Sequence, residues 1–270
     1  MGRSIERASR RLVVSVGVGT LLIAVLLLLH VGMGTVWISP DRVLAALLDR
    51  AHDPVDRQIV WDLRAPRAIV GLICGAMLGL SGALLQVTMR KRNPLADPWL
   101  TGVSTGGVLA GVLVLSGIIG IAVSGPGLTL VVLAGCLAGG GLVYLLSVQR
   151  GRVEPIRLVL IAVIVNAALA LITSLLMLRA GNAIGGMLPW LIGSLNATVW
   201  DDVWRVVPVA LLAIPAAALT APVVTVLQLS DDVAASVGVR VQLARSAIFV
   251  VAAALAAGTV SVTAPSGSWA

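Results

Sequence analysis

Long apolar runs separated by short polar connections dominate the chain. About seven runs approach the roughly 20 mostly apolar residues that a helix needs to cross a bilayer. They cover residues 12–33, 68–87, 99–123, 128–148, 158–178, 206–227 and 246–263. The runs lack the apolar–polar alternation of membrane barrels, and backbone groups in lipid must bond internally. The pattern therefore predicts an all-α, polytopic transmembrane helical bundle.

The composition excludes a water-soluble protein. Of the 270 residues 59% are hydrophobic and 11% are charged, and the mean hydropathy is +1.04. Soluble domains have about 45–50% apolar and roughly 25% charged residues. A single membrane domain over residues 1–270 is expected, with its membrane region at 12–263.

The basic residues predict the orientation of the chain. Cytoplasmic loops of membrane proteins carry an excess of Lys and Arg. With the N-terminus inside, only seven of the 19 basic residues lie outside: Arg42, Arg50, Arg57, Arg64, Arg67, Arg179 and Arg205. The remaining basic residues lie in inner segments, which predicts a cytoplasmic N-terminus in the cell membrane. Because the positive charge lies between apolar runs, no nucleic-acid partner is expected.

The sequence lacks the chemistry of several rival classes. No charged residue lies in the middle of a run, whereas a secondary carrier usually needs an intramembrane carboxylate. No catalytic constellation of an intramembrane enzyme, no phosphate-binding loop and no metal-ligand cluster is present. We expect no cofactor, and we expect Cys74 and Cys136 to behave as small buried hydrophobes.

Small and polar residues inside the runs predict helix contacts. Gly71, Gly75 and Gly79 recur every four residues, a spacing that lets helices approach closely in lipid. Packing is the expected role of this face, with lining of a pathway as the alternative. For Gln86 and Asn166 we expect hydrogen bonds between helices, again with pathway lining as the alternative.

Two connections present groups that fit soluble partners. In the outer loop 34–66, residues 41–52 have the spacing of a short surface helix, and Arg64 and Arg67 follow near the next run. Their guanidinium groups can bind carboxylates on a partner or lie at the membrane interface. The inner segment 228–246 predicts two short helices with an elbow at Gly238. Such a knob fits a cleft on a cytoplasmic partner, although a surface linker is equally compatible with the pattern.

Several motifs in these segments resemble one transport family. They are RAPR (64–67), GAMLGLSGALLQ (75–86), NPLADP (93–98), TGVSTGG (101–107), MLPWLIGSLNATVW (187–200) and SDDVAASVGVRVQLAR (230–245). In this order they resemble the permeases of iron-siderophore, haem and cobalamin ABC importers, the FecCD family. The chain departs from that pattern by extra residues in MRKR (89–92) and at its C-terminus.

The resemblance implies the function and the partners. It implies a permease without covalent chemistry, paired with a second permease subunit, with about ten spans each. Iron-siderophore is the expected cargo, with cobalamin and haem as alternatives. Arg64 and Arg67 match arginines that receive acidic residues of an extracytoplasmic binding protein. The segment that couples to a separate cytoplasmic ATPase matches Asp231, Asp232, Ala234, Ser236, Gly238 and Val239.

The last residues generate a prediction about the gene. The family pattern continues after the seventh run with Gly-Pro-Ile/Val-Gly-Phe-Val-Gly-Leu, whereas this chain ends Ser-Gly-Ser-Trp-Ala. The codons TCG GGT TCG TGG GCC TGA spell this ending, and one added A or G in front of them restores Ile/Val-Gly-Phe-Val-Gly-Leu.

We therefore expect a one-base deletion near codon 266, either in the gene or in its sequencing. The rival to a working permease is then a truncated, inactive fragment. Sequencing the gene tests this. A downstream frame without further apolar spans would contradict it and would favour a genuinely short permease.

Overall fold

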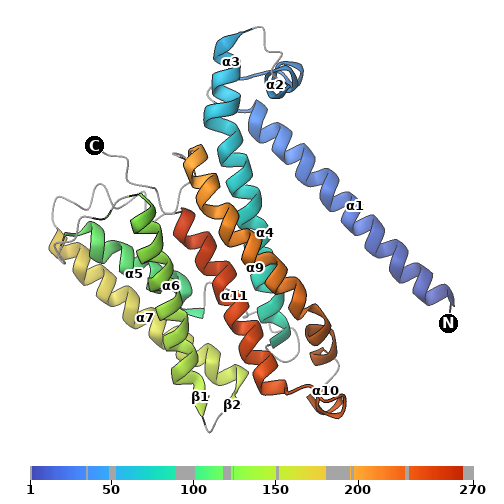
Figure 1. Ribbon diagram of the computed structural model, residues 1–270, viewed down its shortest axis with the longest axis vertical. Helices are drawn as coiled ribbons and strands as arrows, with labels where there is room; N and C mark the ends of the chain where they lie inside the picture. Colours follow the sequence, from blue (N-terminus) through green and yellow to red (C-terminus); the bar gives the residue numbers. More distant parts are fainter. Residues whose placement is uncertain are drawn as a thin grey trace. The chain divides into compact units, whose positions relative to one another are not determined.

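The structure is a computed structural model that describes residues 2–34, 36–48, 53–88, 101–117, 123, 125–149, 152–180, 195, 198–228 and 231–263. Its elements follow one another along the chain as helices interrupted by one small hairpin (Figure 1). They are α1 (Gly2–Gly32), α2 (Pro40–Leu47), α3 (Pro54–Gln58), η1 (Ile59–Arg64), α4 (Ala65–Thr88), α5 (Val103–Leu115), α6 (Pro126–Ser147), β1 (Val148–Gln149), β2 (Arg152–Val153), α7 (Pro155–Ala180), α9 (Trp200–Leu227), α10 (Asp231–Ser236) and α11 (Val241–Thr263).

Six helices among the described residues are long and apolar enough to cross a membrane, which confirms the predicted all-α, polytopic bundle. They are Val13–Gly32, Pro54–Gln86, Pro126–Ser147, Ile156–Ala180, Trp200–Leu227 and Val241–Val262. The side chains of α1 between Val13 and Leu29 are largely exposed, as expected for a helix that faces lipid.

The expected full-length span at 99–123 is not found in the described part of that run. Helix α5 has 13 residues, which corresponds to about 20 Å against a hydrocarbon core of about 30 Å. Two glycines account for its length. Gly102 before it has φ +80° and Gly117 after it has φ +69°, a left-handed conformation that interrupts a helix. The hydrophobicity of the run therefore overstated the length of its helix.

Three further boundaries differ from the sequence prediction. The helix that contains the second span starts at Pro54 rather than at 68, because α3, η1 and α4 follow one another without a break. The surface helix expected at 41–52 is α2, which ends at Leu47. Helix α9 starts at Trp200 rather than at 206, and it continues through Pro208, Pro215 and Pro222, as membrane helices allow where neighbouring groups satisfy the freed carbonyls.

Contacts along the chain divide it into two compact units. The first comprises Met1–Ile69 with Thr198–Trp200, and the second comprises Val70–Ala197 with Asp201–Ala270. The first unit has a small hydrophobic core. In it, Val31 at the end of α1 packs with residues of α2, with a residue of the segment just before α2 and with Val60 of η1. The other members of this core are Ile38, Val43 and Ala46, with Ile59 and Ala68 at its edge. We call the part formed by residues 31–64 with Thr198–Trp200 the outer cap.

The second unit is organised around the short helix α5, which contacts α6, α7 and α11. The backbones of α5 and α6 nearly touch. A Cβ atom at Gly106 would lie 2.4 Å from the carbonyl oxygen of Gly135, and one at Gly139 would lie 2.3 Å from that of Gly102. Only glycine permits this approach.

The glycine face predicted on α4 does not show the close backbone approach that is found between α5 and α6. A Cβ atom at Gly75 or Gly79 would meet nothing within 4 Å among the described residues, and one at Gly71 would meet only Leu195. The close glycine packing of this unit thus lies on α5 and α6, while a packing role for the α4 face stays a prediction.

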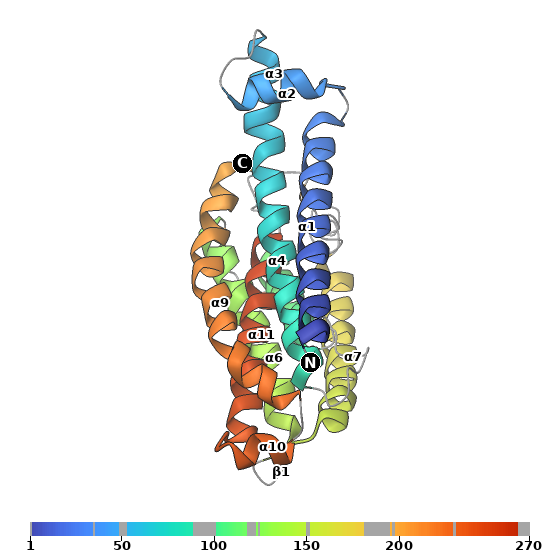
Figure 2. The same ribbon diagram turned by 90° about the vertical axis from the view of Figure 1, so that its right-hand side faces the viewer.

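Hydroxyl groups add hydrogen bonds between the helices of the second unit. Ser81 of α4 donates to the carbonyl oxygen of Ala252 in α11 at 2.7 Å, and the hydroxyls of Tyr144 and Ser246 lie 2.6 Å apart. Such bonds between helices contribute on the order of 0.6–2 kcal/mol each in a membrane. At one end of this unit lie both the β1–β2 hairpin and α10 (Figures 1 and 2).

The α5–α6 contact gives a test of the fold. Gly106→Ala places a methyl group against the backbone of α6 and should lower the free energy of unfolding by about 1–3 kcal/mol. Gly141→Ala is the matched control, because its Cβ atom meets nothing within 4 Å. Unfolding in detergent, followed by circular dichroism, compares the two variants, and equal stability would contradict the packing.

Candidate functional site

An ion pair joins the two short helices of the outer cap. The guanidinium of Arg42 in α2 binds the carboxylate of Asp56 in α3, with Nη2 2.6 Å and Nε 2.7 Å from Oδ2. The Asp56 side chain is 8% exposed, so the bond is partly shielded from water and from salt. The indole of Trp61 adds a second tie, because its Nε1–H donates to the carbonyl oxygen of Ala46 at 3.1 Å. Helices α2, α3 and η1 therefore form one connected cap.

Pro66 explains why η1 is a π-helix. A proline has no N–H and its ring clashes with the carbonyl four residues earlier, here that of Asp62. The chain widens at this point, and the amide of Ala65 bonds the carbonyl of Val60, five residues back. With this spacing of five residues, the donor for the carbonyl of Trp61 would be the backbone N–H of residue 66. Because residue 66 is a proline and has no N–H, the helix itself supplies no donor for that oxygen.

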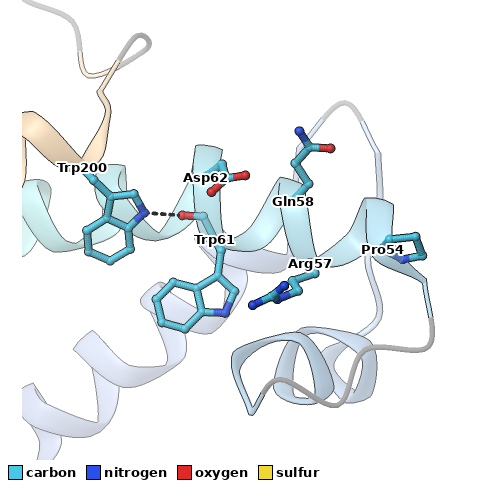
Figure 3. Close-up of a pocket in the computed structure, with 6 residues that line it drawn as sticks. All are labelled: Pro54, Arg57, Gln58, Trp61, Asp62 and Trp200. Atoms are coloured by element: carbon cyan, nitrogen blue, oxygen red, sulfur yellow. Dashed lines mark hydrogen bonds between the residues drawn. The ribbon is translucent and has the colours of Figure 1, made fainter.

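Trp200, the first residue of α9, supplies the missing donor. Its indole Nε1–H lies 3.0 Å from the carbonyl oxygen of Trp61, and the two indole rings stack with centroids 5.7 Å apart (Figure 3). Beside this contact is a pocket of about 460 Å³. It is lined by Pro54, Arg57, Gln58, Trp61, Asp62 and Trp200. The cap therefore presents a rigid indole wall with polar groups around it.

Arg64 lies against the end of α1. Its Nη1 is 2.5 Å from the carbonyl oxygen of Val31 and 3.1 Å from that of Gly32, and its Nη2 is 2.6 Å from that of Val36. The last carbonyls of a helix have no partners within the helix, and a cation there is favoured by the helix dipole. Arg64 thus supplies donors that the chain itself lacks at this point.

The other predicted polar residues lie in different surroundings. Arg67 is half-buried on α4, and Gln86 is exposed near the end of the same helix. Asn166 of α7 accepts a hydrogen bond from the hydroxyl of Thr105 in α5 at 2.5 Å, which is a contact between helices. Among the described residues no group of three His, Cys, Asp or Glu could hold a metal ion.

The inner segment forms one short helix rather than the two that were expected. Helix α10 ends at Ser236, Gly238 shortly after it has φ +86°, and the last part of the segment forms the start of α11 at Val241. Two bonds close the helix end: Gly238 N–H to Ala235 O at 3.0 Å, and Val239 N–H to Ala234 O at 3.0 Å. This Schellman motif makes the elbow rigid.

Of the residues proposed to contact the ATPase, the structure describes the side chains of Ala234 and Ser236. Ala234 is fully buried, and the Ser236 hydroxyl donates to Val233 O at 2.8 Å. The side chains of Asp231 and Asp232, residues 89–100 and most of 187–197 lie outside the description.

Comparison with known proteins decides the family. The model of the FecCD transport family matches residues 21–265. The chain belongs to the FecCD transport family. It is 33% identical over 237 residues to the ferric enterobactin transport permease FepG of Escherichia coli (strain K12), covering 86% of this chain and 68% of FepG. It is 32% identical over 233 residues to the Fe(3+) dicitrate permease FecC of the same organism, covering 84% and 68%.

Two further similarities extend the FecCD assignment. The cobalamin import permease BtuC of Halobacterium salinarum (strain ATCC 700922 / JCM 11081 / NRC-1) is 30% identical over 230 residues, covering 84% of this chain and 60% of that one. A solved structure described as an inward-facing conformation of a metal-chelate type ABC transporter matches with a TM-score of 0.73 and 26% identity, covering 90% of this chain and 73% of that chain. The chain is therefore a multi-pass membrane permease of this family.

Sequence reasoning missed the Trp61–Trp200 contact in this FecCD chain. The two residues are 139 positions apart, and the motif that contains Trp200 gave no sign of its partner. A signal did exist in Pro66, because a proline inside a helix requires a donor from elsewhere for the carbonyls before it.

The Pro66–Trp200 relation can be tested by a double-mutant cycle. Trp200→Phe keeps the ring and removes the N–H, so the free energy of unfolding of the outer cap should fall by about 0.5–1.5 kcal/mol. Pro66→Ala restores a backbone N–H, so the same tryptophan substitution should cost less in that background. Hydrogen exchange of the cap amides measures both differences, and additive effects would show that the two residues are not coupled.

Proposed function

We propose that this chain is the permease subunit of a binding-protein-dependent ABC importer for iron-siderophore complexes. The observation that carries the proposal is the family match together with the named relatives, of which FepG and FecC serve ferric enterobactin and Fe(3+) dicitrate. The likeness to a metal-chelate type ABC transporter supports the same class of cargo. A cobalamin importer is the second candidate, favoured by the similarity to BtuC.

The inner knob is proposed as the contact with the ATPase. Val233 of α10 and Val237, the residue after the helix, lie one turn apart and are 41% and 67% exposed, so they offer a small apolar surface beside the exposed elbow at Gly238. Ala234, which is fully buried, fixes α10 to its own unit. A rigid knob of this kind transmits a displacement of the ATPase to the membrane helices, which couples ATP binding to a change between two arrangements.

The placement of the inner connections supports an N-terminus in the cytoplasm. The charge pattern assigns the connection that contains the β1–β2 hairpin and the segment with α10 to the same side of the membrane. Both lie at the same end of the second unit (Figure 2). We propose a plasma-membrane protein whose outer cap faces the extracytoplasmic space.

The outer cap is proposed as the docking surface for the binding protein, with carboxylates of that protein meeting the arginine pair Arg64 and Arg67. A second permease subunit, identical or related, is proposed to complete the pathway. The match to the family motif at residues 64–67 and the exposed polar groups around the indole wall support this assignment.

The ATPase contact gives the test of the proposed function. Gly238→Val cannot adopt φ +86° without strain, whereas Gly238→Asn can, since asparagine tolerates the left-handed region. The valine variant should lose about tenfold or more in its affinity for the ATPase subunits that co-purify with the unmodified chain, which corresponds to about 1.4 kcal/mol. Asp231→Lys with Asp232→Lys should weaken the complex as well.

The asparagine variant and membrane insertion serve as controls. Asparagine should retain the ATPase, and every variant should insert equally into membranes. An ATPase complex that survives both the valine and the double lysine change would remove the coupling assignment, and failure of any ATPase to associate with the unmodified chain would remove the importer proposal itself.

A further inference from the structure

Helix α2 carries apolar side chains on two different sides. Val43 and Ala46 are buried in the core of the outer cap. Leu44 and Leu47 of α2 and Leu48 directly after it are instead 49%, 38% and 65% exposed, and we call these three residues the leucine stripe. We propose that α2 is an interfacial helix whose leucine stripe lies in the lipid leaflet at which α1 ends. The proposal depends on the membrane fold and not on the transported cargo.

The end of α1 fixes the level of α2 relative to the bilayer. The apolar span of α1 covers Val13–Gly32. Val31 in its last turn belongs to the same core as Val43 of α2, and Ile38 N–H donates to Gly32 O at 3.1 Å. Helix α2 is therefore held where α1 leaves the hydrocarbon. Beyond that level the polar part of a bilayer extends for about 5–8 Å on each side, which places α2 within it.

The direction of α2 fits the plane of this interface. The helix is seen close to end-on in Figure 1 and lengthwise in Figure 2, crosswise to α1. Because α1 spans the bilayer, a helix that lies crosswise at its end runs along the membrane surface. Trp37 in the link between the two helices is 64% exposed. Tryptophan is enriched at this level of membrane proteins because its ring is apolar and its N–H is polar.

The ion pair with α3 shows which side of α2 faces the lipid. Arg64 binds the carbonyl of Val31 and so marks the level at which α1 ends. Asp56 precedes Arg64 by eight residues in one continuous helix, so it lies about 10 Å farther from the bilayer. Arg42 of α2 binds Asp56 at 2.6 Å. Leu44 follows Arg42 by two residues, about 200° around the helix, so the leucine stripe lies opposite the ion pair and toward the lipid.

The lipid that surrounds α1 accounts for the exposed apolar residues of the cap without a further protein. Exposed apolar side chains continue along α1 to Leu29, at 46%, and resume with Met33, at 53%, Trp37 and the leucine stripe. Both charged residues of α2, Asp41 and Arg42, lie in its first turn, so the stripe that follows carries no charge. An apolar surface next to a membrane-spanning helix is favoured in lipid, because burial of apolar area drives the binding of interfacial helices.

An interfacial α2 gives the outer cap two surfaces with different surroundings. The leucine stripe holds the cap at a fixed height on the membrane. The polar groups of α3 and η1 beside the indole wall, which include Arg57, Gln58 and Asp62, stay in water. They remain free of lipid for the docking surface proposed above.

Spin labels in proteoliposomes test the proposal without any partner protein. Labels on Leu44→Cys and Leu48→Cys should be more accessible to oxygen, which dissolves in lipid, than to a water-soluble nickel complex. Their depth should be about 5–10 Å into the boundary of headgroups and acyl chains. Val55→Cys in α3 is the matched control, because Val55 is an apolar residue that is 57% exposed on the part of the cap farther from the bilayer. The unmodified chain, whose Cys74 and Cys136 are buried, gives the background labelling.

Three results would overturn the proposal. Water-like accessibility at both leucine positions, equal to that at Val55, would show that the stripe faces solvent. Spin–spin broadening that disappears on dilution with unlabelled chain would assign the stripe to a contact with a second copy. Accessibility to the nickel complex that falls only when the binding protein is added would assign the stripe to the docking surface.

Trp37 provides a second measurement that needs no cysteine or label. The fluorescence that is lost in Trp37→Phe should be quenched by phosphatidylcholine brominated high in its acyl chains and not by iodide in the water. Quenching of this share by iodide alone would contradict the interfacial position. Failure of the chain to associate with an ATPase or a binding protein would remove the proposed function and leave both membrane measurements unchanged.

Discussion

Peptide groups kept from water need a partner inside the protein, and the outer cap depends on two places where the helices cannot supply one. The first is the end of α1, where Arg64 provides the donors. The second is the turn before Pro66, where Trp200 donates to the carbonyl of Trp61. A buried unpaired group costs about 1–3 kcal/mol. Both hydrogen-bonding side chains bring together segments that are distant along the chain. The shape of the outer cap therefore follows from the need to give each buried backbone carbonyl a hydrogen-bond donor.

The second unit meets the same requirement through close backbone packing. Glycines let α5 and α6 approach until their backbones nearly touch, and hydroxyl groups tie α4 and α7 to their neighbours. Helix α10 is fixed to this unit through the buried Ala234. In the proposed function, an ATPase that displaces α10 acts on a packed group of helices, as alternating access requires.

The sequence predicts the parts of this structure that depend on local composition. The helical class and the glycine elbow at Gly238 follow from hydrophobicity and from helix-ending signals. The short helix α5 does not, because run length cannot show where glycines such as Gly102 take a left-handed conformation. The roles of Arg64 and Trp200 are not predictable either, since their partners lie 33 and 139 residues away. Long-range polar contacts leave no periodic trace in a single sequence.

The central claim is that this FecCD chain transports a chelate with energy taken from ATP. Uptake of a radioactive ferric siderophore into proteoliposomes tests it most directly, with the permease, its ATPase and its binding protein all present. The account predicts uptake that requires ATP and the binding protein and that a proton or sodium gradient cannot replace. Uptake driven by such a gradient without ATP would contradict the account.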